Sequence, residues 1–400
     1  MDKSNKKYKI FCFTVPASGH NIPLYPIINE LNKNYKNVEV VAYTLSNFKQ
    51  QFENVGAKFR NLNFDANKIL ITDPVEDKKR FPGFILYKRI IDLASENIDY
   101  IAREINKGKP DLIVYDATLA GKYFNWAAEY YQKCYYEKTI NGYTYKLPPM
   151  VAFSPSFASD MEVYPNTVEL SSALKPSQLI KFSVMWHFIL YLYAHFKICL
   201  KFRLGFLNPF KKLAPEMAPN TKLYIASVFP ELQPRSHLFD TQIFKFIGCT
   251  VDDKVNDKNY SSMMNEAQIA AILKSFEAVD NKINILDEKT DKLVYMSFGT
   301  MFNYNLDLYK TVFNAFKTFD LEPEKSRSKI KQKSLKVLVS TGEKTYNIFQ
   351  DMINKKEYEL PDNIILAKST PQTEILKRAC LHITHCGMNS TSESIHYSGY

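Results

Sequence analysis

The stretch from Ser369 to His396 decides the fold and reads Ser369-Thr-Pro-Gln-Thr-Glu-Ile-Leu-Lys-Arg-Ala-Cys-Leu-His-Ile-Thr-His-Cys-Gly-Met-Asn-Ser-Thr-Ser-Glu-Ser-Ile-His396. Its middle, Leu381–Thr384, is a short and partly apolar run that predicts a β-strand. The next residues, His385-Cys386-Gly387, predict a sharp turn in which the glycine supplies backbone freedom. The residues after Gly387 predict the start of a helix. Such a start presents unpaired N–H groups and the positive end of a dipole, which suit an anion such as a diphosphate.

Two interpretations of this helix start are open. Asn389 and Ser390 are strong N-cap residues, and Glu393 follows Ser390 at the spacing of a capping box. In the local interpretation these side chains only cap the helix, and the spacing alone favours this because capping boxes are common. In the functional interpretation the same turn binds a ligand. The wider sequence around the turn separates the two.

Several residues around the turn form one longer pattern, which consists of Pro371-Gln372, Leu376 and the run Thr384–Ser394. Together they closely resemble the donor-binding signature of the UDP-glycosyltransferases. The gap from Gln372 to His385, and Met388 where plant members usually carry tryptophan, are similar to the bacterial macrolide-glycosyltransferase branch. The resemblance extends, with gaps, along most of the chain. It is strongest in residues 9–64, 110–126, 223–248, 292–300 and 361–398.

The composition is that of a folded protein with more than one domain. The 400 residues are 46% hydrophobic and 14% aromatic, which is enough to form two cores. The net charge of +10 suits nucleic acid, an anionic membrane surface or a phosphorylated substrate. Because the basic residues are scattered and no nucleic-acid motif accompanies them, we expect no nucleic-acid partner.

The six cysteines are mostly far apart and form no C-x-x-C pair. This spacing favours reduced thiols over a disulfide framework or a zinc site, and it predicts a cytoplasmic protein. The apolar run Ile10–Val15, behind a polar and charged start, is too short for a signal sequence and predicts a strand.

Strand-like apolar runs followed by turns and helical segments recur in both halves of the chain. The first half opens with strands predicted over Lys9–Val15 and Val38–Tyr43, with a turn and a helix between them. The second half begins again with a strand over Leu293–Ser297 and a glycine turn at 298–300. This order predicts an α/β protein with doubly wound parallel sheets.

The resemblance implies the GT-B architecture, in which two facing Rossmann-like, doubly wound domains enclose an interdomain cleft. We expect an acceptor-binding domain at 1–245, an interdomain connector at 246–290 and a nucleotide-sugar donor-binding domain at 291–400. The chain ends at Tyr400, where family members continue through a strand, an acidic-amide pair that holds the donor sugar, and a last helix. The resemblance therefore implies that the C-terminus is truncated and the second domain incomplete.

The segment Phe182–Phe196 contains no lysine, arginine, aspartate or glutamate and is bracketed by Lys181 and Lys197. It is shorter than the roughly 20 apolar residues that a membrane-spanning helix needs. We favour a helix that covers the sheet or lines an apolar acceptor pocket. The alternative is peripheral contact with a membrane surface through residues 182–212. The basic residues that would assist this contact are Lys197, Lys201, Arg203, Lys211 and Lys212.

His20 and Asp116 are the candidate catalytic residues. His20 closely follows the first predicted strand, and Asp116 ends a different strand of the same half. In a doubly wound sheet both side chains emerge at one edge, where they could meet. An imidazole whose tautomer is fixed by a carboxylate can act as a general base. Taken alone, a histidine in a loop is more often structural or merely exposed, and an aspartate at a strand end is commonly only a cap. Both positions, however, match places at which UDP-glycosyltransferases resemble one another.

The resemblance implies an inverting, metal-independent transfer of a hexosyl group from a UDP-sugar to a hydroxyl of a small hydrophobic acceptor. The UDP-sugar is a co-substrate, and no further cofactor is implied. In the donor site, Thr300 and His385 would contact phosphate, and backbone amides from Gly387 onward would surround the diphosphate. Gln372 and Glu393 would hold the nucleoside. The implied donor-binding residues are Thr300, Gln372, His385, Gly387, Asn389, Ser390 and Glu393.

Two other functions are alternatives to glycosyl transfer. Because the resemblance implies an incomplete donor segment, the alternative is a non-catalytic UDP- or lipid-binding protein, or an inactive fragment. A nicotinamide dehydrogenase is disfavoured, since the turns Ser18-Gly19-His20 and Phe298-Gly299-Thr300 do not read G-x-G-x-x-G.

Overall fold

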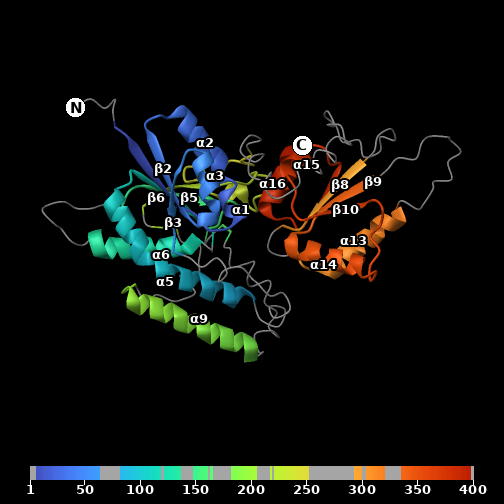
Figure 1. The fold of residues 1–400 in the computed structure, drawn as a ribbon. Coiled ribbons are helices and arrows are strands. Elements are labelled where there is room, and N and C mark those ends of the chain that lie inside the picture. The colour runs from blue at the N-terminus through green and yellow to red at the C-terminus, as the bar shows by residue number, and fades with distance from the viewer. Residues whose placement is uncertain are drawn as a thin grey trace. The chain divides into compact units, whose positions relative to one another are not determined.

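The computed structural model describes residues 6–63, 82–118, 121–136, 147–160, 163–164, 182–204, 217–218, 220–251, 292–299, 303–319 and 335–397. The chain divides into two compact units, Met1–Thr250 and Val251–Tyr400 (Figure 1). Most of the predicted connector, from 252 onward, lies outside the described residues. The boundaries 1–245, 246–290 and 291–400 therefore stay predictions.

The first unit is built on a parallel sheet of seven strands in the order β3-β2-β1-β4-β5-β6-β7. The chain first winds outward from β1 to β3 and then returns to place β4 on the other side of β1. This doubly wound order has its switch point between β1 and β4. The strands are β1 (Tyr8–Phe13), β2 (Val38–Thr44), β3 (Lys58–Asn61), β4 (Leu112–Asp116), β5 (Met150–Ser154), β6 (Thr221–Ala226) and β7 (Phe244–Phe246).

Helices connect these strands, as parallel pairing requires. In Figure 1, α5 and α6 lie beneath the sheet, and α9 lies on the far side of α5 from the sheet. The helices are α1 (Ser18–Asn21), α2 (Leu24–Asn34), α3 (Lys49–Asn54), α5 (Pro82–Gly108), α6 (Lys122–Tyr131) and α9 (Phe182–Lys201). A π-helical turn, Gln132–Tyr136, extends α6, and two 3-10 turns cover Ser46–Phe48 and Ser236–Leu238.

Stacked aromatic rings pack β1 against its neighbouring elements. Phe13 stacks on Tyr43 of β2 and on Phe124 of α6, with centroids 4.6 and 4.8 Å away. Phe124 also stacks on Tyr115 of β4 at 5.0 Å. All four rings are almost completely buried. Because such contacts add to the burial of large apolar surfaces, they hold the strands on both sides of β1 in register.

The second unit repeats the winding of the first. Its parallel sheet has the order β10-β9-β8-β11, so its first strand, β8, again lies between the second and the fourth. The strands are β8 (Lys292–Ser297), β9 (Leu335–Ser340), β10 (Ile364–Ala367) and β11 (Leu381–Thr384). The helices are α13 (Leu306–Phe319), α14 (Glu343–Asn354), α15 (Gln372–Leu376) and α16 (Met388–Tyr397). The predicted α/β fold with Rossmann-like sheets is confirmed in both units.

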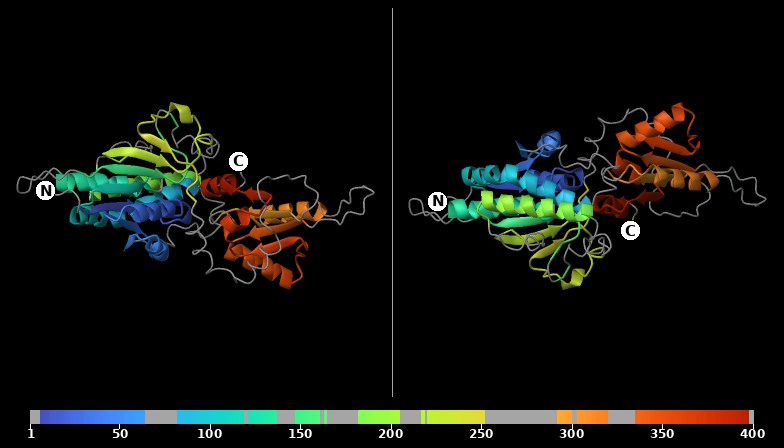
Figure 2. Two further views of the ribbon diagram at one scale, coloured as in Figure 1. Left: turned by 90° about the horizontal axis from the view of Figure 1, so that it is seen from above. Right: turned by 90° about the horizontal axis from the view of Figure 1, so that it is seen from below.

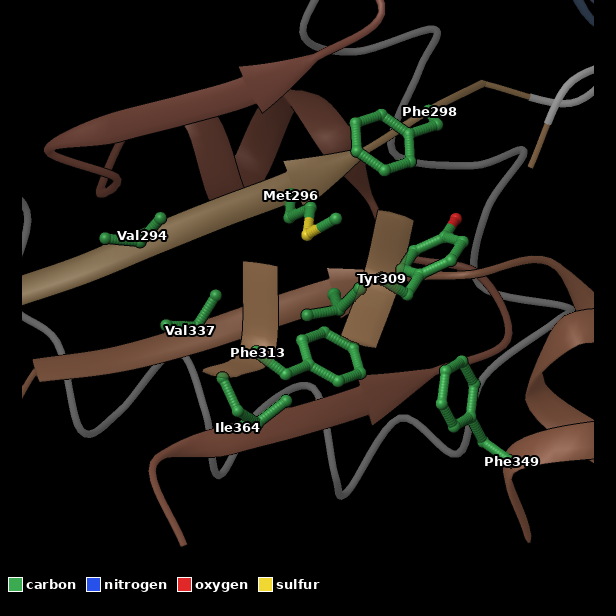
Figure 3. Packing of buried hydrophobic residues seen from close by; sticks show 9 residues of the cluster. Val294, Met296, Phe298, Tyr309, Phe313, Val337, Phe349 and Ile364 are labelled. Carbon is green, nitrogen blue, oxygen red and sulfur yellow. The ribbon is translucent and has the colours of Figure 1, made fainter. Parts of the chain in front are cut away.

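One face of this sheet packs against α13 and α14 through an aromatic core (Figure 3). Phe313 of α13 is completely buried, and so is Phe349 of α14. Their ring centroids are 5.6 Å apart. Val294, Met296, Val337 and Ile364 supply the apolar surface of the strands.

The apolar segment from Phe182 is helical as predicted, but its main neighbour differs from the expectation. Helix α9 packs chiefly on α5, so it forms an outer layer and does not cover the sheet directly (Figure 1). Residues 205–212 of the proposed membrane segment lie outside the described residues. Among the described helices, none is both long and apolar enough to cross a membrane.

We predict that Phe313→Ala destabilises the second unit by about 3–5 kcal/mol, because it leaves a cavity in the core. Urea unfolding followed by hydrogen exchange of peptides from β8 and β9 reports on this unit separately. Leu308→Ala, on the exposed side of the same helix, should change the stability by no more than about 0.5 kcal/mol. Equal effects of the two substitutions would contradict this account of the core.

Candidate active site

The first candidate site lies at the switch point of the first unit. Strands β1 and β4 pair in parallel, with Phe13 opposite Tyr115, so the loops after them begin side by side. His20 lies in α1, just after β1, and Asp116 is the last residue of β4. The Nδ1 atom of His20 is 2.6 Å from Oδ2 of Asp116. The structure therefore brings the two predicted catalytic residues into direct contact.

Hydrogen bonds around the carboxylate define which nitrogen of His20 carries the proton. The second oxygen of Asp116, Oδ1, accepts bonds from the backbone N–H and the hydroxyl of Thr118. An ionised carboxylate can only accept, so the proton in the contact belongs to Nδ1 of His20. Nε2 is then the basic nitrogen. Since the His20 side chain keeps 24% of its surface exposed and that of Asp116 only 2%, the imidazole is the accessible member of the pair.

Asn21 holds the loop that carries His20. Its buried side-chain amide donates to the carbonyl oxygens of Val15 and Ala17, each at 3.0 Å, and its oxygen accepts from the hydroxyl of Thr14. These bonds join the last residue of α1 to the loop that follows β1. Asn21 was not predicted from the sequence, because a polar residue beside a glycine turn is usually exposed. Its position directly after the candidate base was the available signal.

Gly121 allows the chain to pass close to Asp116. A Cβ at this position would lie 2.0 Å from the carbonyl oxygen of Asp116 and 2.8 Å from its Cβ. Gly121 also donates a backbone hydrogen bond to the carbonyl of Thr118. A larger residue at position 121 would therefore clash with the backbone of Asp116.

The second candidate site lies at the switch point of the second unit, where β8 and β11 pair. His385 follows β11, and its ring is closely bounded by two glycines. A Cβ on Gly299 would lie 2.5 Å from Cε1 of His385, and one on Gly387 would lie 2.7 Å from its Nε2. The two turns therefore meet at the imidazole. Thr300, the predicted phosphate contact in the first of these turns, lies outside the described residues.

Helix α16 begins at Met388, which corrects the predicted capping arrangement. Asn389 and Ser390 lie within its first turn and do not precede it. The hydroxyl of Ser390 accepts a bond from Nε2 of Gln372 at 3.2 Å, and the same amide donates to Glu393 at 2.5 Å. The side chains of Ser390 and Glu393 thus point to α15. The capping-box interpretation is wrong, because a tertiary contact replaces the local one.

Gln372 connects Glu393 to the sheet. Its Oε1 accepts a bond from the hydroxyl of Tyr295 on β8 at 3.2 Å, and this hydroxyl is 2.8 Å from that of Thr370. Tyr295 and Thr370 are buried. The network unites three of the predicted donor-binding residues, Gln372, Ser390 and Glu393, whereas His385, Gly387 and Asn389 form the adjoining turn and helix start.

Burial shifts the proton equilibria of this region in opposite directions. It raises the pKa of the Glu393 carboxyl to about 7, since the charged form is poorly solvated, although the bond from Gln372 acts against this. Burial, with a smaller contribution from His385, lowers the pKa of His382 to about 4. The ring of His382 stacks on Tyr295 with centroids 4.9 Å apart, and Nδ1 pairs with the hydroxyl of Ser394. In the described part of the chain, no group of three or more histidine, cysteine, aspartate or glutamate residues is placed to hold a metal ion.

Comparisons with known proteins agree with this architecture. No family model matches the chain. The sequence is 33% identical over 110 residues to a protein of Bacillus subtilis named uncharacterized UDP-glucosyltransferase YdhE, covering 28% of this chain and 22% of that protein. It is 23% identical to the NDP-glycosyltransferase YjiC of the same organism, covering 98% of this chain and 77% of the relative. A third protein of this organism, named uncharacterized UDP-glucosyltransferase YojK, is 26% identical over 165 residues, and the match covers 30% of its length. The matches to YdhE and YojK therefore each span less than a third of the relative.

Solved structures show the same fold. The glycotransferase of kitacinnamycin superposes with a TM-score of 0.62 and 15% identity over 98% of this chain and 79% of its own. The calicheamicin glycosyltransferase CalG4 superposes with a TM-score of 0.59 and 16% sequence identity. This match covers 98% of this chain and 78% of CalG4. UGT71G1 of Medicago truncatula, solved with UDP-glucose, superposes with a TM-score of 0.55 and 17% sequence identity. This match covers 99% of this chain and 80% of UGT71G1.

The fold is therefore that of the GT-B class, built from two Rossmann-like units. The chain is a relative of the UDP- and NDP-glycosyltransferases, and the resemblance stated from its sequence is confirmed.

We predict that Asn21→Ala destabilises the first unit by about 1–3 kcal/mol, because buried carbonyl groups lose their donors. Thermal or urea unfolding followed through hydrogen exchange of peptides from β1 measures this. Asn34→Ala, at the exposed end of α2, is the matched control and should stay within about 0.5 kcal/mol of the unchanged protein. If Asn21→Ala leaves the stability of the first unit unchanged, the loop does not depend on this amide.

We predict that Glu393→Gln removes part of the pH dependence of the stability of the second unit. The folded pKa of Glu393 is about 7 and the ordinary value is 4.5, so between these values the folded state binds more protons than the unfolded state. The stabilising contribution of Glu393 to the free energy of unfolding is therefore fully present below pH 4.5. It is lost as the pH rises through 7, and the total loss is about 3 kcal/mol.

Hydrogen exchange of peptides from α16 at several pH values, with and without the substitution, measures this difference. The opposite contribution of His382 is common to both proteins and cancels. Glu343→Gln, at an exposed carboxylate of α14, should leave the pH profile unchanged. If Glu393→Gln keeps the profile of the unchanged protein, Glu393 is not the titrating group.

Proposed function

We propose that this protein transfers a hexosyl group from a UDP-sugar to a hydroxyl of a small hydrophobic acceptor, with inversion and without a metal ion. The observation that carries the proposal is the 2.6 Å contact of His20 with Asp116 at the switch point of the first unit. The similarity to UDP- and NDP-glycosyltransferases supports the donor class. A small-molecule acceptor is supported by fold neighbours such as the calicheamicin glycosyltransferase.

His20 serves as the general base in this proposal. Nε2 takes the proton from the acceptor hydroxyl as the oxygen forms a bond to the anomeric carbon of the sugar. The bond from that carbon to the diphosphate oxygen breaks, and UDP leaves with the electron pair. Asp116 keeps Nδ1 protonated and stabilises the imidazolium that forms. A single displacement from the face opposite the leaving group inverts the anomeric centre.

The second unit supplies the donor site in this proposal. Peptide N–H groups at the start of α16, from Gly387 to Ser390, and the imidazole of His385 would surround the diphosphate. Thr300 is proposed as a further phosphate contact. These groups would neutralise the leaving charge, which is why the proposal requires no metal ion.

Gln372 and Glu393 would bind the nucleoside. A carboxylate can accept hydrogen bonds from the two neighbouring hydroxyls of a ribose. Gln372 already donates to Oε2 of Glu393 and so fixes the orientation of the carboxylate. Two donating hydroxyls would favour the ionised form of Glu393, so its pKa of about 7 would fall on binding. A cytoplasmic location remains a prediction from the separated cysteines.

We predict that His20→Ala lowers the rate of transfer from a radiolabelled UDP-hexose to a panel of lipophilic alcohols and phenols by about 10²–10⁴-fold, because the general base is lost. Asp116→Asn should also lower the rate, since an amide can present the wrong partner to Nδ1. His237→Ala, an exposed histidine of the same unit, should leave the rate unchanged.

Calorimetric titration with UDP separates the outcomes. Binding of UDP that is equal in His20→Ala and in the unchanged protein, with loss of transfer in the variant only, supports both proposed sites. Full turnover in His20→Ala would exclude it as the base. Binding of UDP without turnover in the unchanged protein would favour the non-catalytic alternative.

A further inference from the structure

Helix α9 has one face buried and one face exposed within the first unit. Ala194, His195, Ile198 and Cys199 are buried on the side of α5. The helix is the outermost element beneath the sheet in Figure 1 and lies in front, in green, in the right-hand view of Figure 2. Among the described residues, α9 therefore packs on the unit through its inner face.

The outer face carries a continuous apolar stripe. Five large side chains, each between 42% and 65% exposed, follow one another at alternating spacings of three and four residues. This spacing places them along one side of an α-helix. The outer stripe consists of Trp186, Ile189, Tyr193, Phe196 and Leu200. A row of this kind differs from single exposed apolar residues, which are common and need no explanation.

Within α9 and the residues that flank it in the sequence, the charged residues all have one sign. Residues 182–204 contain Lys197, Lys201 and Arg203 and neither aspartate nor glutamate. All three basic residues are exposed. In the sequence this bias extends from 170 to 215, with no acidic residue and seven basic ones: Lys175, Lys181, Lys197, Lys201, Arg203, Lys211 and Lys212.

We propose that the outer stripe of α9 binds peripherally to an anionic lipid surface. Tryptophan, tyrosine and phenylalanine make up three of its five residues, and such rings are favoured at the boundary between lipid and water. An amphipathic helix of this type lies in the plane of the surface with its apolar face in the acyl boundary. The lysine and arginine residues beside it then interact with anionic headgroups.

A second copy of the chain fits the same face less well. The spacing of the outer stripe is also that of helices that pair with one another. In such a pair, however, α9 would offer no carboxylate to the lysine and arginine residues of the other copy. Like charges without partners oppose pairing, whereas an anionic surface complements them. The lipid surface is therefore the favoured partner, and this proposal is independent of the proposed glycosyl transfer.

Flotation of the full chain with vesicles tests the proposal. We expect the protein to float with vesicles of phosphatidylcholine and phosphatidylserine, and much less with phosphatidylcholine alone. Trp186→Ser/Tyr193→Ser/Leu200→Ser should lower binding at least about tenfold, because apolar area is lost from the contact. Lys197→Gln/Arg203→Gln should lower binding to the anionic vesicles by about tenfold or more.

Matched controls show whether the position of the substitutions matters. Leu238→Ser/Leu308→Ser changes exposed leucines in other parts of the chain and should leave flotation unchanged. Circular dichroism checks that each variant is folded. The chain has two tryptophans, of which Trp126 is buried, so Trp126→Phe leaves Trp186 as a reporter. Its emission should shift to shorter wavelength when anionic vesicles are added.

Several results would overturn the proposal. One is a lack of flotation with anionic vesicles together with an unchanged emission of Trp186. Another is flotation that the serine substitutions in the outer stripe do not weaken. A third is a concentration-dependent dimer, measured by light scattering, that these substitutions abolish while vesicles have no effect; this would assign the face to a second copy.

Discussion

The parallel pairing of β1 with β4, and of β8 with β11, is the constraint on which both candidate sites depend. Each pair joins strands that are distant in sequence, and the loops after them therefore begin at the same sheet edge. In the first unit this places His20 against Asp116, 96 residues later. In the second unit it places the Gly299 turn against His385. Doubly wound sheets generally bind ligands at this point, because the loops diverge there.

The first site is held by buried polar groups that have partners. Asp116 accepts three hydrogen bonds from His20 and Thr118, and Asn21 satisfies the carbonyl groups of the loop beside it. An unpaired group in these positions would cost about 1–3 kcal/mol. The same hydrogen bonds therefore hold His20 and Asp116 in their relative orientation. Rigid placement of an imidazole is also what a general base requires.

The second site shows how a tertiary contact replaces a local one. Ser390 and Glu393 have the spacing of a capping box, yet both side chains bond to Gln372. The helix begins earlier, at Met388, so the two residues face α15. Burial between two helices also gives Glu393 its raised pKa. Helix α9 is comparable: its apolar character was evident from the sequence, but the division into a buried and an exposed face depends on α5.

From the sequence alone, most of the strands, several helices and the doubly wound class could be predicted, because hydrophobic period and glycine turns are local signals. Strand β3 and helix α14 were not predicted. The sequence also indicated His20, Asp116 and the segment 385–393, since each lies at or after the end of a predicted strand. Only the tertiary structure decided which side chains meet, that Asn21 and Gly121 support the first site, and that Glu393 binds Gln372. The physical reason is that these contacts join residues far apart in the chain, and their energies depend on burial and on distances that no local pattern encodes.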